Sequence, residues 1–204
     1  MKFWRYFQNL LTINAPWIRR IGVWAGICFG LGCLAYIIYP GLLPEFLRFL
    51  EKVFKDIFGP KVERLDFSAS LLIFRNNLVA ASFSLFLGVF LGIIPVVSVG
   101  LNFFVLGFLF AVFITSAKLG GLTFFFFVMP HGIFEIPALI IAAAFGLKLG
   151  FFWTRPTKSL DRRGNLLAIL KQNLQILPLL ILLFLAAALT EVFVTGNLVR
   201  FFVK

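Results

Sequence analysis

The chain has 204 residues, of which 61% are hydrophobic and only 13% are charged, and its mean hydropathy is +1.03. Soluble domains carry roughly 25% charged residues, and a core of this size could not hide so much apolar surface from water. The composition therefore excludes a soluble domain and predicts one all-α domain, a polytopic bundle of transmembrane helices.

The formal net charge of +11 is distributed in a way that argues against a nucleic-acid partner. Basic residues gather before the first apolar stretch and again between two later ones, where only Asp161 opposes them. Such basic segments mark the cytoplasmic side of membrane proteins and contact anionic headgroups. We therefore expect a multi-pass protein of the cytoplasmic membrane that binds no nucleic acid. The two groups are Lys2, Arg5, Arg19 and Arg20, then Lys148, Arg155, Lys158, Arg162, Arg163 and Lys171.

The first apolar run, residues 21–39, is long enough to cross a bilayer and is expected to be the first transmembrane helix. Residues 1–20 alternate apolar and basic side chains at near-helical spacing, which predicts an interfacial segment. Gly22, Gly26 and Gly30 recur every four residues along one face of the first span. This spacing favours close approach of another helix, although glycine is also simply common in membrane helices.

Residues 45–66 form the least hydrophobic part of the middle of the chain. Apolar residues recur there at i, i+3 and i+4, while the opposite face carries a balanced set of acidic and basic residues. We expect an amphipathic segment that lies along the outer membrane surface or docks a partner protein.

Two further spans are predicted at 71–97 and 101–118, joined by so short a link that they should be antiparallel neighbours. Gly88 and Gly92 form a small-residue pair in the first of them, which suggests helix packing. Pro95 and Gly100 are expected to mark its end.

The apolar block after residue 118 is too long for one crossing and too short for two. Pro130 and Gly132 interrupt it, so we expect a short re-entrant arm at 119–130 and a fourth span at 131–149. A basic cytoplasmic loop at 150–173 and a fifth span at 174–195 follow. With the basic segments inside, the N-terminus is expected in the cytoplasm and the C-terminus outside.

Polar residues that the bilayer disfavours fall at similar depth in three spans. An ionisable side chain at the bilayer centre costs roughly 2.5–3.5 kcal/mol, so such residues need partners. If the second, fourth and fifth spans meet, two carboxylates, one imidazole and one guanidinium could satisfy one another. The predicted intramembrane polar cluster comprises Arg75, Asn76, Asn77, His131, Glu135 and Glu191.

His131 and Glu135 are four residues apart and therefore share a helix face, which Ala138 continues as a small residue suited to close packing. Pro137 cannot donate a backbone hydrogen bond, which leaves the carbonyl of Ile133 free to accept one. Three interpretations stay open: a structural polar knot, a proton- or ion-linked transport site, and an intramembrane enzyme. His131 is the only histidine, so neither a metal site nor another cofactor is expected, and no catalytic residue is assigned.

With these residues the chain resembles the stage II sporulation protein M family of bacterial and archaeal membrane proteins. The resemblance implies a helical protein of five or six spans without known catalysis. In the name-giving branch it implies a membrane complex that recruits peptidoglycan-degrading enzymes during engulfment of the forespore. The motifs that carry it are Ile73-Phe74-Arg75-Asn76-Asn77, Asn102 with Gly107, Pro130-His131-Gly132, Glu135-Ile136-Pro137-Ala138, and residues 187–195.

The sequence thus favours a non-enzymatic scaffold or subunit of a membrane complex, with other membrane or envelope proteins, or further copies of this chain, as partners. The amphipathic segment and the glycine-lined first span are the expected partner surfaces. The alternative is a small transporter or channel-like subunit that uses the polar cluster.

Overall fold

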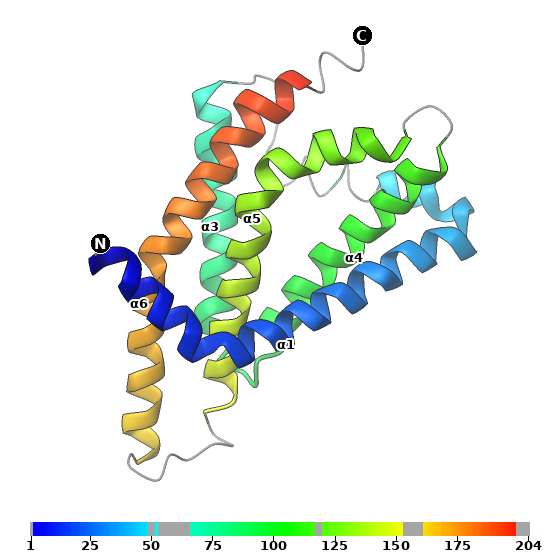
Figure 1. The fold of residues 1–204 in the computed structure, drawn as a ribbon. Coiled ribbons are helices and arrows are strands. Elements are labelled where there is room, and N and C mark those ends of the chain that lie inside the picture. Colours follow the sequence, from blue (N-terminus) through cyan, green and yellow to red (C-terminus); the bar gives the residue numbers. More distant parts are fainter. Residues whose placement is uncertain (1, 49–51, 53–65, 117–119, 153–160, 199–204) are drawn as a thin grey trace.

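Five long helices make up most of the computed structural model in Figure 1, which describes residues 2–48, 52, 66–116, 120–152 and 161–198. These five are long and apolar enough to cross a membrane, and no strand occurs among the described residues. The predicted all-α, polytopic fold class is therefore confirmed. The elements are α1 (Lys2–Ile38), the 3-10 turn η1 (Pro40–Leu42), α3 (Phe67–Leu87), α4 (Ile93–Thr115), α5 (Gly120–Gly150), α6 (Arg162–Thr190) and the π-helical turn η3 (Glu191–Thr195).

Helix α5 is the central element, because it contacts α1, α3, α4, α6 and η3. Its alanines belong to two separate hydrophobic cores. Ala138 and Ala142 pack into a core with α3, α6 and the N-terminal part of α1, whereas Ala143 and Ala144 pack into a core with α1 and α4. Small side chains on both faces let four helices approach one axis closely.

Glycines bring pairs of helices into backbone contact. A Cβ atom added at Gly146 of α5 would collide with the carbonyl of Ser84 in α3, and one at Gly88 would collide with Gly146 itself. Gly32 and Gly107 hold α1 and α4 together in the same way. Where lipid surrounds the helices, such close packing supplies much of the attraction between them.

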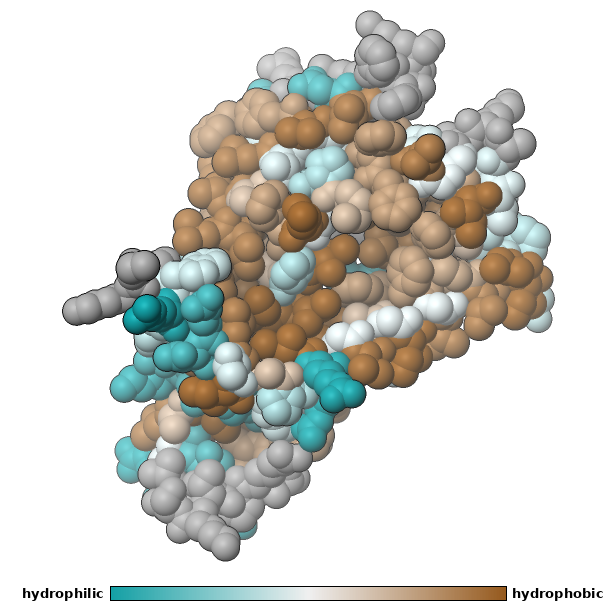
Figure 2. Space-filling view, viewed as in Figure 1, coloured by the Kyte–Doolittle hydropathy of each residue, from teal (hydrophilic) through white to brown (hydrophobic). Residues whose placement is uncertain are grey.

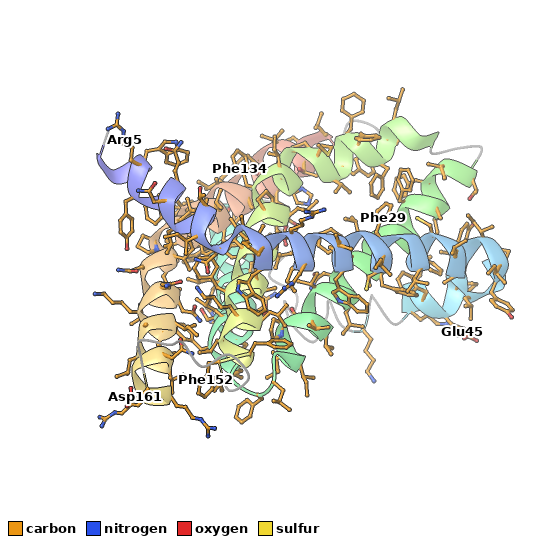
Figure 3. All side chains as sticks on the ribbon, turned by 60° about the horizontal axis from the view of Figure 1, so that its bottom comes forward. Arg5, Phe29, Glu45, Phe134, Phe152 and Asp161 are labelled. Carbon is orange, nitrogen blue, oxygen red and sulfur yellow. The ribbon has the colours of Figure 1, made fainter. Side chains whose placement is uncertain are left out.

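The expected interfacial segment 1–20 and first span 21–39 form one helix, α1, rather than two elements. This helix changes direction near Pro16, as Figure 1 shows at the lowest part of α1. A proline inside a helix removes one backbone hydrogen bond and bends it. Before the bend, Figure 2 shows hydrophilic residues along the N-terminal stretch, and Arg5 in Figure 3 points away from the bundle.

The boundary between the second and third spans lies about ten residues earlier than predicted. Helix α3 ends at Leu87, not at 97, and α4 begins at Ile93, not at 101. Leu91 and Gly92 have φ angles of 55° and 70°, which turn the chain between the two helices. Pro95 falls in the first turn of α4, where the backbone N–H has no helical partner to lose. Proline here starts a helix instead of ending one.

We expected a re-entrant arm at 119–130 and a separate span at 131–149, but the helix does not break between them. Helix α5 is continuous from Gly120 to Gly150, with Pro130 and Pro137 inside it. Figure 1 shows that its first turns run across the top of the molecule before the helix bends into the bundle. The prolines therefore bend the helix without ending it.

The fifth span begins twelve residues before the predicted position 174, because α6 starts at Arg162 within the expected basic loop 150–173. Asp161, labelled in Figure 3, caps this helix by accepting a 2.7 Å hydrogen bond from the N–H of Gly164. Asp66 caps α3 in the same manner. The rest of the predicted amphipathic segment 45–66 is described only at residues 45–48 and 52, so its placement lies outside the described residues.

Candidate functional site

Polar side chains of α3, α5 and η3 come together where the middle of α3 meets the middle of α5. From α3, the side-chain amide of Asn77 donates a 3.3 Å hydrogen bond to Oε1 of Glu135 on α5. Both side chains are partly buried. This contact joins two residues that are 58 positions apart in sequence.

One turn earlier on α5, His131 contacts the π-helical turn η3. Its Nδ1 lies 3.2 Å from the hydroxyl of Thr195, which is only 7% exposed. The widened π-helical turn places Glu191 and Thr195 on one side of the chain, four residues apart. We call Asn77, His131, Glu135, Glu191 and Thr195 the His–Glu cluster.

Glu191 is half-buried and close enough to Glu135 for the two carboxyl groups to interact electrostatically. Its side chain forms no hydrogen bond with any residue that the structure describes. The sequence predicted Glu191 at the depth of the cluster. In the structure, the hydrogen bonds of the cluster are formed by other residues, Asn77 with Glu135 and His131 with Thr195.

Arg75 does not take part in the His–Glu cluster. Its side chain is exposed, and within the described ranges it has no hydrogen-bond or ion-pair partner. Asn76 is half-buried and likewise has no hydrogen bond there. We expected a guanidinium to neutralise the carboxylates. In the structure, the neutral amide of Asn77 binds the carboxylate of Glu135 instead. Helix geometry explains this, because consecutive residues point about 100° apart and only one of the three can face α5.

Thr195 was missed by sequence reasoning as a partner of His131. The signal that could have found it is the spacing to Glu191, since residues four apart share a helix face. A hydroxyl on that face is a natural partner for an imidazole at the same depth.

A second polar cluster at the lower end of the bundle was not predicted at all. The ammonium group of Lys148 on α5 donates to Asn14 Oδ1 on α1 at 2.7 Å and to Gln172 Oε1 on α6 at 2.6 Å. Asn14 is fully buried and also donates to the carbonyl of Leu10 at 2.8 Å. We call Asn14, Lys148 and Gln172 the lysine cluster. It ties the bent helix α1 to the two helices behind it.

The predicted packing residues differ in what they contact. Gly88 and Ala138 are in tight contact between helices, and Gly92 forms the turn before α4. Gly132 has only ordinary contacts within α5, while Pro130 and Pro137 lie at its bent part. Gly22, Gly26 and Gly30 have open space on the side where a side chain would begin, since a Cβ added at any of them would meet no atom of another described helix within 4 Å.

The chemistry of the two clusters is that of hydrogen bonding between helices. Among the described residues, no three His, Cys, Asp or Glu side chains are placed to hold a metal ion. His131, Glu135 and Lys148 all stand on α5, and each meets side chains of a different helix. The central helix is therefore joined to the rest of the bundle by polar contacts at its middle and near its C-terminal end.

Comparison with known proteins identifies relatives for most of the chain. The family model described as stage II sporulation protein M matches residues 23–196. An uncharacterized protein of Methanocaldococcus jannaschii is 26% identical over 176 residues, which cover 82% of this chain and 77% of that protein. No solved structure matches the chain.

Proposed function

The chain belongs to the stage II sporulation protein M family, and from this premise we propose that it is a non-enzymatic scaffold or subunit of a membrane complex. Its membrane-spanning helices place it in a membrane. The partners that we propose are other membrane or envelope proteins, with further copies of this chain as the second possibility for the same surface.

This proposal rests on one observation: the polar groups within the bundle form hydrogen bonds between helices of the same chain. Asn77, His131, Glu135 and Lys148 bond to side chains of neighbouring helices in the same chain. Polar residues used in this way fix helix register and hold a bundle in one arrangement. A scaffold requires such a fixed arrangement, whereas a carrier has to exchange these contacts to move its cargo.

The α1 surface that contains Gly22, Gly26 and Gly30 supports the same proposal. The other glycines of the helix interfaces are already covered within the chain, whereas these three are not. Val23 and Ile27 beside them are 57% and 51% exposed. A helix of a partner protein would find on this face the close approach that glycine permits.

The proposal is tested by the size of the complex that the protein forms in its native membrane. Full-length tagged protein is extracted in mild detergent and separated on a native gel. We expect it to migrate as a stoichiometric complex heavier than one 23.0 kDa chain. Gly22→Leu/Gly26→Leu should release the single chain, whereas Val23→Leu/Ile27→Leu on the neighbouring positions should not. Migration of the unchanged protein as a single chain would contradict the proposal.

Transport is examined separately with purified protein in liposomes. Flux of protons or monovalent ions above that of empty vesicles, abolished by Glu135→Gln, would replace the scaffold proposal with a transport function.

Co-expression of two differently tagged copies distinguishes self-assembly from assembly with another protein, because only self-assembly lets one tag recover the other.

A further inference from the structure

A groove at the bend of α1 combines an apolar floor with an arginine at its edge. It has a volume of about 520 Å³ and lies between α1, the turn before α4, and the end of α5. This volume is within the range of roughly 300–1,000 Å³ that is usual for ligand sites. Its apolar lining includes Ile93, Val96, Val97, Leu147 and Phe151, and none of its lining residues is acidic.

Arg20 is fixed at the edge of this groove. Its guanidinium carbon lies 4.7 Å from the ring centroid of Trp17, a cation–π contact. The Trp17 ring in turn packs against Phe151, with 5.5 Å between ring centroids. A guanidinium is planar, so stacking on an aromatic face leaves its in-plane N–H groups available to donate to a phosphate group.

Arg20 also borders a second groove, of about 730 Å³, whose described lining includes Ala15, Pro16, Arg19 and Val23. Arg20 therefore lines both grooves, and the adjacent Arg19 lines the second. Both arginines are exposed, and neither forms an ion pair with a carboxylate of the described chain. Their charge is available to an anion.

The position of the groove relative to the lipid decides which anion this is. Leu91, Ile93 and Val97 are 66%, 56% and 49% exposed, so the floor of the groove continues into the apolar surface of the protein. At the bend of α1, Figure 2 shows a hydrophilic patch next to apolar surface. A tryptophan beside such a boundary is typical of the headgroup level of a bilayer.

We propose that this groove binds an anionic phospholipid, with its phosphate against Arg20, the charge of Arg19 beside it in the second groove, and an acyl chain along Val96, Val97 and Leu147. The apolar floor matches a hydrocarbon chain, and the paired arginines match the headgroup charge. Basic pockets between membrane helices recognise anionic headgroups by the same combination.

The proposal is tested by lipid titration of the purified full-length protein in non-ionic detergent, with bound lipids counted by native mass spectrometry. We expect dioleoyl phosphatidylglycerol to bind more tightly than dioleoyl phosphatidylcholine, which has the same chains. Each arginine near a headgroup contributes about 1 kcal/mol, so Arg20→Gln should weaken phosphatidylglycerol binding about fivefold and Arg19→Gln/Arg20→Gln about 25-fold.

Two further variants separate the site from a general charge effect. Arg162→Gln/Arg163→Gln removes the same charge from the start of α6 and should leave lipid binding within about twofold. Val97→Trp fills the groove without touching the arginines, and it should weaken binding although the charge is unchanged. Size-exclusion profiles show that each variant is folded.

Three results would overturn the proposal. The first is equal binding of both lipids, and the second is unchanged binding after Arg19→Gln/Arg20→Gln. The third is displacement of the lipid by millimolar inorganic phosphate, which would make the site one for free anions.

Discussion

At the scale of single residues, Glu135 carries the clearest prediction, because its carboxylate is the acceptor for the Asn77 amide between α5 and α3. Glu135→Ala leaves that partly buried amide without its acceptor, so we expect a loss of about 1–3 kcal/mol in stability. Thermal unfolding in detergent, followed by circular dichroism, measures this as a lower Tm. Glu135→Gln retains a carbonyl oxygen at the same place and should remain close to the unchanged protein. An equal Tm for all three proteins would show that the contact does not stabilise the bundle.

The lysine cluster gives a second prediction at this scale. Lys148→Met leaves the oxygens of Asn14 and Gln172 without their cation, and we expect it to lower stability by about 1–3 kcal/mol. Lys171→Met is the matched control, because Lys171 is exposed and its loss should change stability by no more than about 0.5 kcal/mol.

A double-mutant cycle separates the lysine contact from the loss of charge. Lys148→Met combined with Gln172→Leu should cost less than the sum of the two single changes, with a coupling of about 0.5–3 kcal/mol. Strict additivity of the two changes would mean that the hydrogen bond makes no net contribution.

Sequence reasoning found the residues of one cluster better than those of the other for a physical reason. His131, Glu135 and Glu191 stand out because each interrupts an apolar span, where an ionisable group is costly. Asn14, Lys148 and Gln172 fall at the ends of apolar runs, where polar residues are ordinary, so nothing in the pattern marks them. Their proximity depends on the bend of α1, which sequence spacing does not determine.

At the scale of helices, glycine contacts lead to a prediction with an internal control. Gly146→Ala places a methyl group against the carbonyl of Ser84, so α5 and α3 have to separate, and we expect a loss of about 1–3 kcal/mol. Gly22→Ala adds the same methyl group where no atom lies within 4 Å, and in the isolated chain it should be neutral or slightly stabilising. Unfolding in detergent compares the two directly. A destabilising Gly22→Ala together with a neutral Gly146→Ala would contradict the helix arrangement.

The existence of the helices followed from hydropathy, but their limits did not. Long apolar runs predict spans because every backbone group in a bilayer has to be bonded within the helix. Proline is ambiguous as a boundary: Pro95 starts α4, whereas Pro16, Pro130 and Pro137 lie inside helices. Whether a proline starts, bends or ends a helix depends on the tertiary contacts around it, and these are not visible in the local sequence.

At the scale of the whole molecule, five candidate spans predict that the two ends of the chain lie on opposite sides of the membrane. The basic residues at the start of α6 predict that this end of the bundle faces the cytoplasm and that the end of α6 faces outward.

Single cysteines test this orientation in a protein whose own Cys28 and Cys33 have been replaced by alanine. Asn197→Cys, at an exposed position beyond η3, should react with a membrane-impermeant maleimide added to intact cells. Arg163→Cys, exposed at the start of α6, should react only after the membrane is opened. The reverse pattern would invert the orientation, and it would also place the arginine-edged groove at the outer leaflet, where fewer anionic headgroups are available to Arg19 and Arg20.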